Sequence, residues 1–316
     1  MRHSMYDLIA ANKRNSWILI LLMASLIIAV GALIGAAWVE SPGGGLAVAA
    51  ALALGMFLVS WYGGRGLILA MSGAKKVEHA KYPQLDNVVE EMAIAAGVPK
   101  PEIYLIEDSA LNAFATGRDP KRAAVAITRG LLEKLDRDEL QGVMAHELSH
   151  VRNFDIRYAM LMAVMVGTVA LLCDFFLRTL RVGFRPSGGR SERRGRRGGG
   201  GGAAQAAILI AALVLAILAP IVAKIIQLAM SRQREYLADA SAAELTRYPE
   251  GLARALEKIA NDKEVLEAAN RATQHLYIVN PIKPFEARAR SLFATHPPVL
   301  DRIARLRAIA ASAAPR

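Results

Sequence analysis

The chain has a single cysteine, Cys173, among its 316 residues. An intrachain disulfide is therefore excluded, and packing and polar contacts must stabilise the fold without it. Charge is also missing over long stretches, most clearly from Trp17 to Trp38. A bilayer core of about 30 Å requires uncharged blocks of this kind. The composition therefore predicts a membrane protein.

Four apolar blocks predict membrane segments. Pro42 and the three glycines that follow it favour a tight turn between the first two blocks, which would then form a hairpin. The first block is too long for the apolar core of a cleavable signal peptide, so we expect it to be retained. The predicted segments are about 17–38, 46–62, 158–176 and 206–228.

Two charged residues, Asp174 and Lys224, fall inside the later blocks. A charge within a span often marks a transport pathway, but near the end of a span it more often reaches the interface. Both residues lie toward such ends, and the chain lacks the repeated halves that transporters contain. The sequence therefore disfavours a transporter.

Positive charge exceeds negative charge, with 39 Lys and Arg against 28 Asp and Glu. Much of the excess flanks apolar blocks, and no nucleic-acid recognition motif accompanies it, so we expect an anionic lipid surface as partner and no nucleic acid. Basic residues before the first block and after the second predict a cytoplasmic location for 63–157. The Arg- and Gly-rich linker at 181–205 conflicts with this rule. Either the linker is translocated, or the second hairpin does not fully cross.

The stretch VMAHELSHVRNFD holds two histidines and a glutamate within five residues. Just before it, Asp136 and Glu139 predict a capping box that opens a helix. On that helix His146 and His150 share a face, at a separation suited to two ligands of tetrahedral zinc. Glu147 is then placed to act as a general base toward a water at the metal. HExxH on a helix is the zincin signature, and two surface histidines are the alternative.

A zinc site of this kind needs a third protein ligand, for which a carboxylate is a better candidate than the remaining histidines. In the helical stretch AMSRQREYLADASAAELTRY, Glu235 and Asp239 are four residues apart and share a face. Glu235 can ligate the metal, while Asp239 can orient a ligand histidine through its free ring N–H. The alternative is a solvated helix face on which Arg232 and Arg234 pair with nearby acids.

The pair HELSHVRNFD and SRQREYLADASA resembles the HtpX membrane metalloproteases, gluzincins that are bacterial relatives of the CaaX prenyl proteases. IEDSALNAFATG and THPPVLDRIARL extend the resemblance over nearly the whole chain. It implies a zinc endopeptidase with one zinc ion per chain. The implied zinc ligands are His146, His150 and Glu235, with Glu147 as general base and Asp239 orienting a ligand.

The resemblance adds two further roles. The NAFAT segment matches an edge strand on which a substrate peptide pairs through backbone hydrogen bonds. His296 matches a histidine that stabilises the developing oxyanion, although Pro297 and Pro298 also suit a plain helix start. The implied substrate-binding residues are Asn112, Ala113, Phe114 and Ala115.

The fold class predicted from these features is α+β. A multi-pass helical membrane anchor carries a zincin-like, mostly helical catalytic domain bearing a small β-sheet. The predicted parts are a transmembrane hairpin at 1–62, a first protease part at 63–157, a second hydrophobic hairpin at 158–228 and a second protease part at 229–316.

The resemblance also implies a location and a role. We expect a multi-pass protein of the bacterial inner membrane whose active site faces the cytoplasm. Its substrates would be misfolded or damaged membrane proteins or other polypeptides, with a functional link to other membrane quality-control proteases. The alternative class is a zinc-containing membrane scaffold without proteolysis. A scaffold would need a fourth protein ligand, which no residue near the motif supplies.

Overall fold

The computed structural model of the chain has two compact units, each built from separated parts of the sequence. The sheet-bearing unit comprises Met1–Ile18, Ser60–Ala163 and Leu228–Arg316. The apolar-helix unit comprises Leu19–Val59 and Val164–Gln227. Within these bounds, the structure describes residues 5–39, 42–183, 201–228, 232–262, 264, 277–278 and 297–313.

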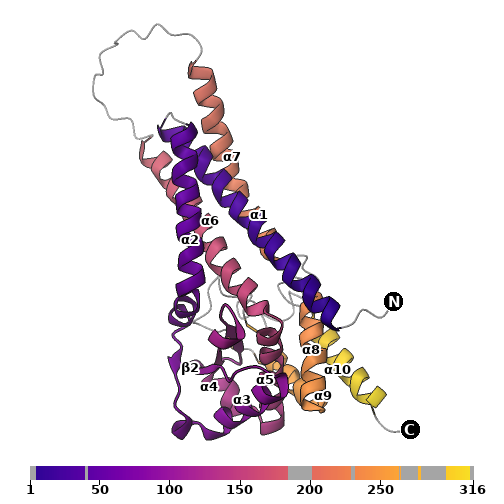
Figure 1. The fold of residues 1–316 in the computed structure, drawn as a ribbon. Helices are drawn as coiled ribbons and strands as arrows, with labels where there is room; N and C mark the ends of the chain where they lie inside the picture. The colour runs from indigo at the N-terminus through magenta and orange to yellow at the C-terminus, as the bar shows by residue number, and fades with distance from the viewer. Residues whose placement is uncertain are drawn as a thin grey trace. The chain divides into compact units, whose positions relative to one another are not determined.

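Four long helices carry the apolar blocks: α1 (Met5–Val39), α2 (Pro42–Met71), α6 (Asp155–Gly183) and α7 (Gly201–Leu228) (Figure 1). Among the described residues, three helical stretches are long and apolar enough to cross a membrane, and α1 holds a shorter one at Ile20–Leu33. The three longer stretches are Ala53–Met71, Asp155–Arg178 and Ala206–Ala223.

The helices are longer than the predicted apolar segments. α2 continues to Met71, beyond the segment end at about Tyr62, and it begins at Pro42, so the glycines expected in a turn are helical. α6 and α7 extend into both ends of the predicted 181–205 linker, and residues 184–200 lie outside the described part of the chain. Within α6, Asp174 pairs with Arg178 at 2.7 Å, and both side chains are exposed. The Lys224 side chain lies outside the described residues.

A four-stranded mixed sheet lies in the sheet-bearing unit, in the order β1-β2-β4-β3. β2 and β4 are parallel, while β1 and β3 run antiparallel to their neighbours. Two short apolar runs bounded by Pro, Gly or Asp, PEIYLIED and AAVAITRG, predict strands, and they form β2 and β4. β3 is at the edge of the sheet, as the resemblance implies for NAFAT. The strands are β1 (Lys75–Lys76), β2 (Glu102–Ile106), β3 (Ala113–Thr116) and β4 (Ala124–Thr128).

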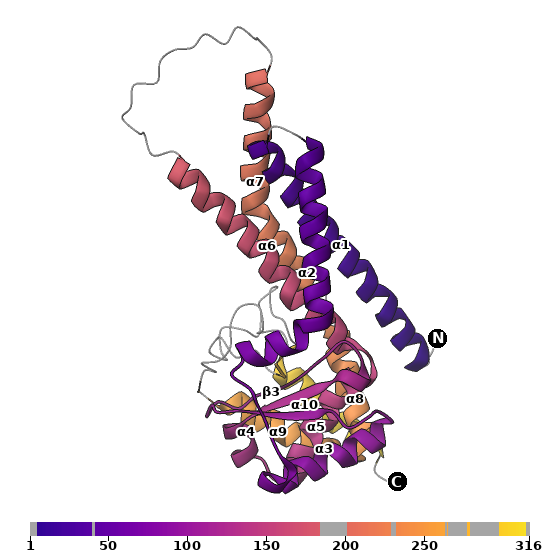
Figure 2. The ribbon, with the colours of Figure 1, turned by 60° about the vertical axis from the view of Figure 1, so that its left-hand side comes forward.

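Among the described residues, six α-helices lie wholly within this unit: α3 (Pro83–Ala96), α4 (Arg129–Lys134), α5 (Arg137–Arg152), α8 (Arg232–Thr246), α9 (Pro249–Asn261) and α10 (Val299–Ala313). α5 is central, because it packs against α3, α8, α9 and the edge strand β3 (Figure 2). The architecture is α+β and mostly helical, with a small mixed sheet and several apolar helices, as predicted.

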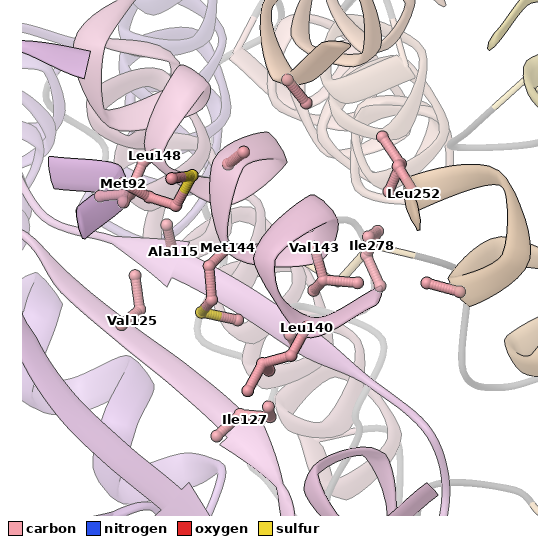
Figure 3. Packing of buried hydrophobic residues seen from close by; sticks show 14 of the residues in the cluster. Met92, Ala115, Val125, Ile127, Leu140, Val143, Met144, Leu148, Leu252 and Ile278 are labelled. Atoms are coloured by element: carbon pink, nitrogen blue, oxygen red, sulfur yellow. The ribbon is translucent and has the colours of Figure 1, made fainter. Parts of the chain in front are cut away.

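The core of the unit forms between α5 and the sheet. Leu140, Met144 and Leu148 recur every four residues on α5, so they lie along one face of the helix. Figure 3 shows these side chains packed toward the strand residues Ile127 and Ala115. All five are buried, and this packing fixes α5 against the sheet.

α5 and α9 approach each other closely because each has a glycine at the crossing. A Cβ on Gly142 would lie 2.6 Å from the backbone nitrogen of Leu252. A Cβ on Gly251 would lie 2.7 Å from the carbonyl oxygen of Asp138. Neither distance is compatible with a side chain, so the crossing requires glycine on both helices.

Candidate metal centre

α5 positions three of the predicted site residues. The predicted capping box opens the helix: Glu139 N–H donates to Asp136, and Asp136 N–H donates to Glu139, both at 2.9 Å. One helical turn separates His146 from His150, so both rings project from one face. Their Nε2 atoms lie 3.2 Å apart, and the ring planes meet at 88°.

α8 adds a carboxylate to the two histidines. Glu235 Oε1 lies 3.6 Å from His150 Nε2, and Oε2 lies 3.8 Å from His146 Nε2. One ligand atom from each of these residues lies within 4.8 Å of the others. The structure thus brings together the three residues that the sequence suggests as metal ligands.

On the His146 side, the carboxylate of Asp239 accepts a hydrogen bond from Nδ1 at 3.0 Å. Arg302, on α10, donates to both oxygens of Asp239 at 2.7 and 2.8 Å and is fully buried. Although burial alone would raise the pKa of Asp239, the charge and hydrogen bonds of Arg302, together with His146, lower it to about 2. Asp239 is therefore ionised throughout the physiological range.

On the His150 side, the carboxylate belongs to Asp155, the first residue of α6, with Oδ2 3.1 Å from Nδ1. Burial alone would lower the pKa of His150, but the hydrogen bond with Asp155 and the charges of Glu235, Asp155 and Glu147 raise it to about 9. Arg234, on α8, lies 3.8 Å from Asp155 Oδ1. Each histidine thus has its own carboxylate, and an arginine lies near each carboxylate.

Glu147 is buried beside the two histidines. Burial raises its pKa to about 7, and the negative charge of Glu235 adds to this rise. A hydrogen bond from the backbone of Ala115, on β3, and the charge of His150 act in the opposite direction. A carboxylate with a pKa near 7 can both accept and release a proton at neutral pH.

The edge strand β3 lies next to this cluster, but part of it has an internal partner. Ile278 N–H donates to the carbonyl oxygen of Ala113 at 2.9 Å. Arg302 donates to the carbonyl oxygen of Ile278 at the same distance. The Tyr277 ring packs edge-on against Phe114, with the ring centroids 5.0 Å apart. The Tyr277–Ile278 segment therefore covers the start of the strand.

The four residues predicted to bind substrate differ in their surroundings. Asn112 is buried, and its side-chain oxygen accepts the N–H of Ala113 at 3.1 Å. The carbonyl of Ala113 is bonded to Ile278 and the Phe114 ring to Tyr277, whereas the backbone of Ala115 points to Glu147. Ala115 thus adjoins the carboxylate of Glu147.

Sequence reasoning does not single out three buried residues of the cluster. Asp155 lies within the HELSHVRNFD motif and Arg302 within THPPVLDRIARL, so position in those motifs is an available signal. The sequence suggests Arg234 only as part of a solvated face, whereas the residue is 7% exposed. His296 lies outside the described residues.

The chain is similar to known proteins. Residues 79–310 match the model of peptidase family M48. A protease HtpX homolog of Listeria innocua is 46% identical over 303 residues, covering 96% of this chain and 99% of the relative. One from Dictyoglomus thermophilum is 44% identical over 305 residues, with 96% and 94% covered.

Among solved structures, the crystal structure of S. mikatae Ste24p matches with a TM-score of 0.45 and 19% identity. The match covers 94% of this chain but 65% of that structure, so the chain spans just under two thirds of its length.

Proposed function

The chain belongs to peptidase family M48 and is an HtpX-like membrane protease, and we propose that it is a zinc-dependent endopeptidase. The observation that carries the proposal is the convergence of His146, His150 and Glu235 from two helices, with Glu147 buried beside them. Catalytic zinc sites use three protein ligands of these types and keep a further position for water or substrate.

The spacing of the donor atoms fits one zinc ion. Two nitrogens bound to the same tetrahedral zinc at about 2.0–2.1 Å lie about 3.3 Å apart, and the two Nε2 atoms are separated by 3.2 Å. The two shortest distances from the Glu235 oxygens to these nitrogens are 3.6 and 3.8 Å. The donor set of two imidazoles and one carboxylate is also one that zinc accepts.

Zinc in this cluster would polarise the scissile carbonyl and make the attacking water more acidic. Glu147 would accept a proton from that water as its oxygen adds to the carbonyl carbon. Glu147 would then transfer the proton to the amine nitrogen as the C–N bond breaks. Its pKa of about 7 suits both transfers. Asp239 would hold the His146 ring through Nδ1–H throughout.

An extended polypeptide is the proposed substrate, and it would pair with the outer edge of β3. The carbonyl of Ala113 already has a partner in Ile278, and the backbone N–H of Ala115 donates to Glu147. We therefore place this pairing at the carbonyl of Ala115 and beyond. His296 is the proposed stabiliser of the oxyanion. Substrates would include misfolded or damaged membrane proteins, in agreement with the membrane helices.

We place the protein in the bacterial inner membrane, with the active site facing the cytoplasm. The distribution of Lys and Arg before the first span and after the second supports this orientation. The proposed biological role is stress-responsive quality control of membrane proteins, alongside other membrane proteases. Anionic lipid, and no nucleic acid, is the proposed surface partner of the basic flanks.

The decisive experiment compares the detergent-purified chain with its Glu147→Gln variant. Zinc content is measured by elemental analysis, and cleavage is followed with casein or a membrane substrate. We expect about one zinc per chain in both proteins and cleavage by the wild type alone, because an amide side chain cannot accept the proton. A chelator should abolish wild-type cleavage, and added zinc should restore it.

Glu244→Gln provides the matched control, since Glu244 is an exposed carboxylate on α8. This variant should keep both zinc and activity. Cleavage by Glu147→Gln at the wild-type rate would refute the assigned role of Glu147. Zinc-free wild-type protein that still cleaved would refute the metal mechanism.

A further inference from the structure

His150 is held by a group that is neither in HExxH nor in the Glu235–Asp239 pair. Its Nε2 faces His146 and Glu235, while Nδ1 lies 3.1 Å from the carboxylate of Asp155. A carboxylate at this distance accepts the Nδ1–H bond and so fixes both the tautomer and the orientation of the ring. Since Asp155 begins α6, the contact joins α5 to a helix that is long and apolar enough to span a membrane.

The turn between the two helices makes this contact possible. On a continuous helix, a residue five positions after His150 would lie about 140° around the axis, too far for the hydrogen bond. Phe154 instead adopts a left-handed conformation with φ of 62°, which is unfavourable for a bulky side chain. The reversal returns Asp155 to the imidazole. Such a conformation persists only where the surrounding contacts hold it, and it occurs most often at functional sites.

Arg234 supports the carboxylate from the other side. Its guanidinium lies 3.8 Å from Asp155 Oδ1 and 4.8 Å from the ring centroid of Tyr158. Both charged side chains are more than nine-tenths buried, and a nearby cation offsets part of the cost of burying a carboxylate. Arg234 directly precedes Glu235, so one turn of α8 supplies a proposed metal ligand and this cation.

We propose that Asp155 is a positioning residue for His150 and that Arg234 acts through Asp155. The arrangement parallels Asp239 and Arg302 on the His146 side, but it is built at the start of α6 and α8. The orientation of the second metal ligand then depends on how the chain enters α6 and continues after α7. This inference rests on the proposed metal function of the site.

The test measures zinc affinity of the full chain in detergent by chelator competition. Asp155→Asn should weaken zinc binding about 10- to 100-fold, the range found when outer partners of metal ligands are removed. Arg234→Met should weaken it by a smaller factor. Because Arg234 acts through Asp155, the double variant should lose no more than Asp155→Asn alone.

Asp262→Asn is the matched control. Its carboxylate, like that of Asp155, accepts a hydrogen bond, here from the backbone N–H of Leu111 at 3.0 Å, and it lies in the same unit without touching a proposed ligand. Zinc affinity should stay at the wild-type value in this variant, while thermal unfolding reports any general loss of stability. A merely structural role for Asp155 would lower the unfolding temperature and leave the zinc affinity of folded protein unchanged.

Wild-type zinc affinity in Asp155→Asn, or additive losses in the double variant, would overturn the inference. So would an equal loss in Asp262→Asn. If Asp155→Asn does not fold, Arg234→Met provides the test. A wild-type zinc affinity in Arg234→Met would overturn the proposal that Arg234 acts on His150 through Asp155. A wild-type chain that binds no zinc would refute the proposed metal site itself. That outcome differs from a failure of the role proposed for Asp155, in which the wild type still binds zinc.

Discussion

His146 and His150 lie one turn apart on the same helix, and both face Glu235, yet their surroundings differ. The carboxylate behind His146 is bound by Arg302 through two hydrogen bonds of 2.7 and 2.8 Å. The carboxylate behind His150 has Arg234 at 3.8 Å. Burial lowers the pKa of His146, with the charge of Arg302 acting in the same direction, whereas acidic neighbours raise the pKa of His150 to about 9.

The difference shows that a carboxylate partner does not by itself determine the protonation of a histidine. The nearby cation also matters, because its charge opposes protonation of the ring. The lowered pKa of His146 favours its neutral form, which the proposed metal requires. In the proposed site, the proton on His150 must leave before a metal can bind.

Replacing Glu235 should have the largest effect, because this residue faces both histidines. Glu235→Gln leaves two strong ligands where catalytic zinc sites have three. We expect a loss of zinc affinity greater than the roughly 10- to 100-fold expected for an outer partner. Zinc content after dialysis measures it, with Glu244→Gln on the same helix as the control. Full zinc retention in Glu235→Gln would show that the two histidines do not share this ligand.

Arg302→Met should destabilise the buried surroundings of His146. It would leave the buried Asp239 without its hydrogen-bonded cation, and removing one partner of a buried ion pair costs about 3–5 kcal/mol of unfolding free energy. Denaturant unfolding in detergent provides the measurement. Arg307→Met should cost far less, because Arg307 pairs with Glu250 and Glu257 at the surface. Equal losses would mean that burial of the Arg302 pair is unimportant.

The pH dependence of zinc binding should distinguish the two histidines. Because the pKa of His150 is raised to about 9, its proton stabilises the zinc-free fold fully below the ordinary value of about 6.5. That contribution is lost as the pH rises through about 9. Zinc displaces the proton, so apparent affinity should rise up to about tenfold per pH unit between these values.

Titration calorimetry at several pH values can follow this change. Performing it in Glu147→Gln removes a second group of the site that titrates near neutral pH, since the pKa of Glu147 is about 7. The slope should fall in Asp155→Asn, where the pKa of His150 loses its main support. A zinc affinity independent of pH from about 6.5 to about 9 would contradict the protonated state of His150.

The smallest expected change affects neither histidine directly. Asp136→Ala removes the N-cap of α5, which should cost about 1 kcal/mol of stability. Since the cap lies more than two turns before His146, zinc affinity of the folded protein should remain unchanged. Thermal unfolding and chelator competition on the same sample test both expectations. An altered affinity would show that the helix transmits strain from its start to the site.

Local periodicity made much of the site predictable. HExxH requires only a helix to bring His146 and His150 together, and the capping box at Asp136 identified where that helix begins. The four-residue spacing of Glu235 and Asp239 likewise predicts that both lie on one face of a helix. The strands β2 and β4 followed from short apolar runs bounded by turn residues.

The remaining contacts depend on tertiary structure. Arg302 reaches Asp239 from another helix, and Asp155 reaches His150 only because Phe154 is left-handed. Nothing in the sequence around Phe154 indicates that conformation, which is rare for its residue type. The hydrogen bond from Ile278 to Ala113 likewise joins segments far apart in sequence. Such contacts follow no sequence periodicity and could not be predicted from one sequence.

The site also determines when the protein becomes active during its synthesis. His146 and His150 precede the two apolar helices α6 and α7, whereas Glu235, Asp239 and Arg302 follow them. A nascent chain that has emerged only through α7 contains the HExxH helix but no third ligand. In the proposed mechanism, a competent peptidase therefore exists only after the ribosome has completed both apolar helices. The order of residues thus delays proteolysis until these segments have been made.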